Sequence, residues 1–148
     1  MKVLACLFGL STLLGPAAQA QEVDTRTAVL CSQAMLLGTK ASAELCKWKR
    51  TATDDAIDAA LSDIDTFIIK NSSRLVSQDQ LDVYEASSIQ QSVEAYAAEP
   101  GYCRFDPADK SAPAALPWAL HTMKAAKLSA WIADDLSVPR EPDMNPCL

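Results

Sequence analysis

The stretch TATDDAIDAALSDIDTFIIK, residues 51–70, carries the clearest helical pattern in the chain. At about 100° per residue its apolar side chains share one arc, as in a helix with one buried face. These side chains are Ala56, Ile57, Ala60, Leu61, Ile64, Phe67 and Ile68. Thr51 or Thr53 can cap the helix start, and aspartates follow where the helix dipole favours them. We predict an amphipathic helix here and expect the other helices to pack around it.

The opposite arc of this helix carries Asp54, Asp58 and Asp65. Paired carboxylates can bind calcium or act as acid and base. A calcium site needs oxygen ligands wrapped around one point, however, and a straight helix points them outward. The sequence contains no D-x-D-x-D-G loop. We therefore predict a solvated aspartate face rather than a metal or catalytic site, and we expect no cofactor.

Composition favours a single helical domain of ordinary size. The chain has 148 residues, of which 49% are hydrophobic and 22% charged, and glycine is scarce. Its net charge of −6 argues against nucleic acid and against an anionic membrane surface, since both attract basic proteins. Lys47, Lys49 and Arg50 form a local basic cluster, which we interpret as a solvated helix end. A contact patch for an acidic partner is the alternative.

The N-terminus has the pattern of a secretory signal peptide. Lys2 provides positive charge, residues 3–14 are apolar, Gly15-Pro16 breaks the run, and Ala18-Gln19-Ala20 matches a cleavage site. The apolar run is too short for a stable membrane span, and a buried N-terminal helix is the alternative. We predict cleavage after Ala20, a single mature domain at residues 21–148, and a periplasmic or secreted location.

Export changes the meaning of the cysteines. Once the signal peptide and its Cys6 are removed, four remain: Cys31, Cys46, Cys103 and Cys147. An even number in an oxidising compartment predicts two disulfides, with three possible connectivities. A zinc site is the alternative, but the chain has no C-x-x-C pair and a single histidine.

A helical hairpin in residues 22–50 would select one connectivity. Residues 23–37 are apolar and helix-prone, Gly38 offers a left-handed helix end, and residues 42–48 could form a second short helix. Folding back at Gly38 would place Cys31 opposite Cys46. We therefore favour Cys31–Cys46, which leaves Cys103–Cys147.

Two more helices complete a predicted bundle of four to five. Ser77 and Gln80 match a capping box, with Val76 and Leu81 as a hydrophobic staple, and this helix should run to about Glu99. Its expected inner face contains Ala86, Ile89, Val93, Tyr96 and Ala97. The last helix should span residues 117–136, followed by a proline-rich tail at residues 137–148.

The irregular stretch at residues 100–116 is the candidate partner-binding loop. Cys103 anchors it, and Tyr102, Arg104 and Phe105 flank that cysteine. Tyrosine and arginine are enriched at the energetic centres of protein interfaces. The alternative is that Tyr102 and Phe105 only cover the core beside the disulfide.

The last predicted helix carries the candidate pocket residues Trp118 and His121. Its apolar side chains form two patches, so the helix is either buried on two sides or exposes one patch for binding. A histidine on an apolar stripe is usually a satisfied core residue. The alternative is an enzyme or ligand carrier with a cavity beside His121 and Trp118. No G-x-S-x-G, phosphate-binding loop or haem motif occurs in the sequence.

In export, size and helix content the chain resembles two families, the periplasmic immunity proteins of type VI secretion amidases and the small acid-stress chaperones of the periplasm. The resemblance assigns no functional residue. We expect a non-catalytic protein of the bacterial periplasm that binds another exported protein, as an inhibitor, immunity or adaptor protein. A stress chaperone is the alternative, and the sequence indicates no oligomeric state.

Overall fold

The computed structural model describes residues 26–144 and confirms the all-α prediction. Within this range it has five helices and no strand. The helices are α1 (Val29–Cys46), α2 (Ala52–Asn71), α3 (Gln78–Ala97), α4 (Ala115–His121) and α5 (Ala125–Asp135). The predicted signal peptide, its cleavage site after Ala20 and Cys147 lie outside the described residues.

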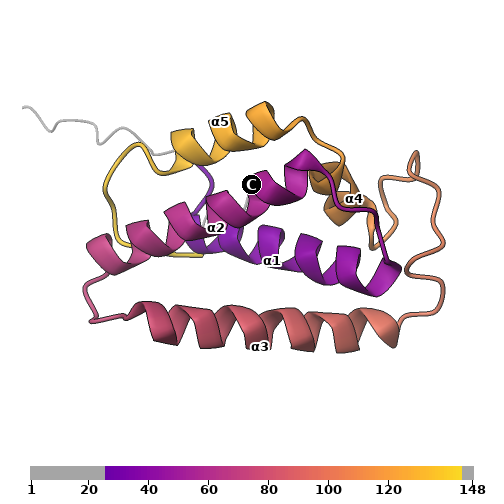
Figure 1. The fold of residues 1–148 in the computed structure, drawn as a ribbon, viewed down its shortest axis with the longest axis horizontal. Helices are drawn as coiled ribbons and strands as arrows, with labels where there is room; N and C mark the ends of the chain where they lie inside the picture. Colours follow the sequence, from indigo (N-terminus) through magenta and orange to yellow (C-terminus); the bar gives the residue numbers. More distant parts are fainter. Residues whose placement is uncertain (1–25, 145–148) are drawn as a thin grey trace, which may run out of the picture.

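Helices α1 and α2 together form the centre of the bundle, whereas the sequence predicts α2 as the single central helix. Helices α3 and α4 pack mainly on α1, and α5 packs on α2. In Figure 1, α3, α1, α2 and α5 follow one another from bottom to top as roughly aligned layers. Small buried side chains, among them Ala41 and Ser42, let neighbouring elements approach α1 closely.

Helix α2 begins at one of the two caps that its sequence allows, Thr51 rather than Thr53. Thr51 and Asp54 form a reciprocal capping box, and the apolar arc from Ile57 to Ile68 is buried. The prediction of a solvated aspartate face is wrong, because Asp65 is only 3% exposed and Asp54 and Asp58 are half-buried. These carboxylates face other elements of the bundle, which an isolated helical pattern does not reveal.

The predicted hairpin at Gly38 is also wrong, because α1 runs through this residue without a break. A Cβ atom at Gly38 would lie 3.1 Å from the hydroxyl oxygen of Tyr96 on α3. The glycine therefore allows close helix packing rather than a turn. Lys47, with φ of 56°, supplies the left-handed residue that ends α1.

The disulfide pairing differs from the predicted one because α1 is continuous. Cys46 pairs with Cys103, with their Cα atoms 5.3 Å apart. Along one helix Cys31 and Cys46 are separated by about 22 Å, at about 1.5 Å per residue, so they cannot pair. The predicted pairs Cys31–Cys46 and Cys103–Cys147 are therefore both wrong. Cys31 is also disulfide-bonded.

The predicted helix at residues 117–136 is divided in two. Lys124 is extended, with φ of −64° and ψ of 130°, and the carbonyl of Met123 accepts a hydrogen bond of 2.6 Å from the Thr53 hydroxyl. This interaction holds the break against the start of α2. As a result α4 packs on α1 while α5 packs on α2.

Helix α3 is the most exposed of the three long helices. Its capping box between Ser77 and Gln80 is present, and Val76 packs against the core as predicted. Of the α3 residues, however, Leu81 alone is buried, and two members of the expected inner face, Ala86 and Ala97, are exposed. Contact with α1 comes mainly from half-buried side chains along one edge of the helix.

We predict that removing the Cys46–Cys103 disulfide lowers the free energy of unfolding by up to about 4 kcal/mol. The bond closes a loop of 57 residues, and this value follows from the loop-closure entropy of the unfolded chain. Urea unfolding of a Cys46→Ser/Cys103→Ser variant measures the loss. Peptide mapping of the non-reduced protein should recover the 46–103 linkage; a 31–46 linkage would contradict the structure.

Candidate functional site

Three aromatic side chains from separate segments adjoin one another at one end of the bundle. Trp48, just after α1, lies 5.0 Å from Trp118 of α4 between ring centroids, with the planes at 76°. Phe105, in the loop before α4, lies 6.2 Å from Trp118 at 78°. All three side chains are half-buried, so each keeps some contact with solvent. We call Phe105, Trp118 and Trp48 the aromatic row.

His121 supports the aromatic row from the protein interior. It is 4% exposed, and its ring lies 5.0 Å from that of Trp48 and 5.8 Å from that of Trp118. Its Nδ1 atom lies 3.0 Å from an Asp54 carboxylate oxygen. The imidazole is therefore packed between two tryptophans and hydrogen-bonded to α2, which fits a buried structural histidine.

Asp54 connects the cap of α2 to this histidine. Burial alone would raise the pKa of the Asp54 carboxyl, but the backbone and hydroxyl of Thr51, with His121, hold that pKa below its ordinary value. The Thr51 backbone N–H donates to Asp54 at 2.6 Å, and its hydroxyl donates at 2.9 Å. One ionised carboxylate thus caps α2 and orients the imidazole behind the aromatic row.

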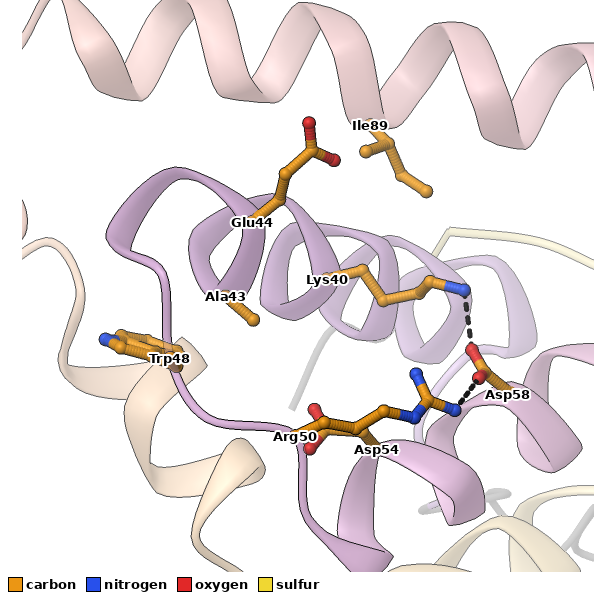
Figure 2. A pocket seen from close by; sticks show the side chains of 8 residues that line it. All are labelled: Lys40, Ala43, Glu44, Trp48, Arg50, Asp54, Asp58 and Ile89. Atoms are coloured by element: carbon orange, nitrogen blue, oxygen red, sulfur yellow. Dashed lines mark hydrogen bonds and ion pairs between the residues drawn. The ribbon is translucent and has the colours of Figure 1, made fainter.

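A pocket of about 290 Å³ opens next to Trp48, between the second half of α1, the start of α2 and Ile89 of α3. Figure 2 shows the side chains of Lys40 and Arg50 running in the same general direction, Lys40 above Arg50, to Asp58. The pocket is lined by Lys40, Ala43, Glu44, Trp48, Arg50, Asp54, Asp58 and Ile89. The candidate pocket residues Trp118 and His121 do not line this pocket. Both rings contact Trp48, which lines it, and His121 is also hydrogen-bonded to Asp54, another lining residue.

The base of this pocket is a network of paired charges. Lys40 Nζ lies 2.6 Å from one Asp58 oxygen, and Arg50 Nη2 lies 2.7 Å from the other. Arg50 also pairs with Asp55 at 2.6 Å. Burial would raise the pKa of the Asp58 carboxyl, but these two cations hold it below its ordinary value, and the same carboxylates raise the pKa of Arg50. The pocket therefore presents both signs of charge beside an apolar wall.

The predicted contact residues of the 100–116 loop occupy different environments. Tyr102 is 5% exposed, stacks on Tyr96 at 4.5 Å, and has its hydroxyl 2.7 Å from that of Ser42. Burial raises its pKa. Arg104 is exposed and Phe105 is half-buried. Tyr102 thus covers the core and anchors the loop, while Arg104 and Phe105 are left at the surface.

Several residues of this region were not predicted as site residues. Trp48, Asp54 and Asp58 come together only after α1 ends at Lys47 and the chain reverses into α2. The sequence gives one signal for Trp48. It lies two positions after Cys46, so it should lie close to the segment that contains the disulfide partner of this cysteine. Without the correct pairing that signal points to the wrong segment.

Comparisons of the chain with protein-family models, with curated proteins and with solved structures find no match. Among residues 26–144, no helix combines the length and apolar character that crossing a membrane requires. In the same range no group of three or more His, Cys, Asp or Glu side chains is placed to hold a metal ion.

We predict that Asp54→Asn lowers the free energy of unfolding by about 1 kcal/mol at neutral pH, since charge-assisted hydrogen bonds to Thr51 and His121 become weaker. A carboxyl with a lowered pKa stabilises the fold above its ordinary pKa, near about 4, and loses this effect as pH falls through the lowered value. Urea unfolding should therefore show a smaller difference at about pH 3. The exposed Asp63→Asn is the matched control, and an equal effect of both variants would contradict the assignment.

Proposed function

We propose that this chain is an exported, non-catalytic protein-binding protein of the inhibitor, immunity or adaptor type. The proposal rests on the aromatic row, in which Phe105, Trp118 and Trp48 are held in contact at one end of the bundle while remaining partly exposed. Tryptophan and arginine are the residue types most often found at interface hot spots. The exposed cations Arg104 and Arg50 belong to the same two segments as Phe105 and Trp48.

The aromatic row is also rigid, which favours binding. Cys103 fixes the loop to the end of α1, Tyr102 inserts into the core, and His121 supports both tryptophans. The loop is ordered further by Asp106 and by Asp109, whose side chains accept hydrogen bonds from the backbone two residues later. A surface ordered before binding loses less conformational entropy in the complex.

An exported partner follows from the proposed location of this chain. The signal-peptide pattern and the paired cysteines both favour an oxidising compartment. Cys46 and Cys103 pair with each other and Cys6 would leave with the signal peptide, so we propose Cys147 as the partner of Cys31. The pocket beside Trp48 is large enough to accept a side chain of the bound protein.

A second candidate function is small-ligand binding in the same pocket. Its volume of about 290 Å³ and its mixture of paired charges with Trp48 and Ile89 favour a small amphipathic molecule. This function would use the pocket without Arg104 or Phe105, so the two candidates predict different sensitive residues.

We predict that the mature, oxidised protein captures one stoichiometric exported partner from its own cell envelope. A Phe105→Ala or Arg104→Ala change should weaken the complex at least about tenfold, as expected for hot-spot residues. Lys110→Ala, an exposed cation of the same loop, is the control and should leave affinity unchanged. Binding that survives the double Arg104→Ala/Phe105→Ala change would remove the aromatic row from the interface. Failure to capture any single partner would reject the protein-binding function.

Export is tested separately. We expect the protein in the periplasmic or secreted fraction, with Gln21 as its first residue, because Ala18-Gln19-Ala20 matches a signal-peptidase site. Intact mass and N-terminal sequencing of the fractionated protein measure both. A full-length chain that stays inside the cell with free thiols would contradict the proposed location and the second disulfide.

A further inference from the structure

A cluster of carboxyl and amide side chains links α3 to α1 and α2. Gln33 of α1 donates through Nε2 to Asp65 of α2 at 3.2 Å and to Glu85 of α3 at 3.1 Å. Gln78, the first residue of α3, donates to Asp65 at 2.6 Å and to Asp82 at 2.9 Å. We call Gln33, Asp65, Gln78, Asp82 and Glu85 the carboxyl–amide cluster. It contains three acids, and every hydrogen-bond donor within it is neutral.

The charges around the cluster favour the loss of a negative charge. Asp65 and Glu85 accept from the same amide nitrogen across the α2–α3 boundary, and Asp82 adds a third acid on α3. Lys40 of α1 is the cation acting on Glu85, and its ammonium group is paired with Asp58. Two like charges bridged by a neutral amide repel each other in a partly desolvated site.

The environment of each acid acts in the same direction. Burial raises the pKa of Asp65, and the charge of Asp82 adds to this effect despite the hydrogen bond from Gln78. Burial likewise raises the pKa of Glu85, as do the charges of Asp65 and Asp82, while Gln33 and Lys40 oppose the shift. Both acids thus take up a proton at higher pH in the folded protein than in the unfolded chain.

We propose that the carboxyl–amide cluster is a pH-sensitive latch that seats α3 on α1 and α2 more firmly in mildly acidic solution than at neutral pH. Protonating Asp65 removes its repulsion with both Glu85 and Asp82 across the α2–α3 boundary, and protonating Glu85 removes the repulsion between Glu85 and Asp65. The remaining carboxyl oxygens still accept from Gln33 and Gln78. Helix α3 is the element that responds, because Leu81 is its single fully buried residue and its other contacts with α1 come from half-buried side chains.

The direction of the pH effect follows from the raised pKa values. A group that binds its proton more tightly when folded stabilises the fold increasingly as pH falls through its raised pKa. The effect is complete below the ordinary values of about 4 and is lost as pH rises above the raised ones. Asp54 and Asp58 have lowered pKa values, so their effect on the stability of the fold has the opposite sign and appears at lower pH. Their partners lie on α4 and α1 rather than on α3.

Hydrogen exchange of the mature, oxidised protein tests this latch on α3 itself. After correction for intrinsic exchange, α3 amides should be about three to ten times better protected at about pH 5 than at about pH 7.5, because protonation of the cluster holds α3 more firmly against local opening. The α3 amides should gain more protection than the α2 amides. Equal or lower protection of α3 at the acidic pH overturns the proposal.

Variants that mimic the protonated acids separate the latch from other effects of pH. The Asp65→Asn/Glu85→Gln variant should lose the pH dependence and show at neutral pH the protection of the acidic wild type. Asp63→Asn and Glu94→Gln, exposed on the same two helices, should retain the wild-type response. If the double variant does not fold, Glu85→Gln alone should reduce the dependence, and an unchanged dependence in it overturns the proposal. The result is independent of any partner, since it is measured on the isolated protein.

Discussion

The buried polar side chains of α1 fix the positions of the elements around it. Ser32 donates to Asp135 of α5 at 2.7 Å, and Gln33 donates to acids of both α2 and α3. Ser42 donates to the Gly38 carbonyl and lies 2.7 Å from the hydroxyl of Tyr102. Because an unsatisfied buried polar group costs about 1–3 kcal/mol, a shift of any neighbour along α1 would leave such a group without its partner. Hydrophobic burial drives the collapse, and these bonds select one arrangement.

The candidate site is a consequence of how α1 ends. The left-handed Lys47 turns the chain toward α2 and places Trp48 beside α4, while the preceding Cys46 holds the loop that contains Phe105. A buried imidazole bonded to Asp54 then supports the tryptophans from inside. The aromatic row therefore depends on contacts between residues that are far apart in the sequence.

The aspartates of α2 show how the surroundings of each carboxyl along one helix set the direction of its pKa shift. Burial would raise the pKa values of Asp54 and Asp58, but both are lowered, because Thr51 and His121 stabilise the charge of Asp54 and Lys40 and Arg50 stabilise that of Asp58. Asp65 lies farther along the same stripe, and its pKa is raised by burial and by the charge of Asp82, despite the hydrogen bond from Gln78. One face of one helix thus carries carboxyls whose pH responses have opposite signs.

The sequence by itself determined the features that depend on neighbouring residues. The capping boxes at Thr51 and Ser77, the buried arc of α2 and the helical class all follow from local hydrogen bonds and periodicity. Only the tertiary structure decided that Gly38 admits Tyr96, that Cys46 pairs with Cys103, and that the aspartate face is covered. Each of these depends on a residue distant in sequence, and periodicity along one helix shows which side is apolar but not what lies against the other side.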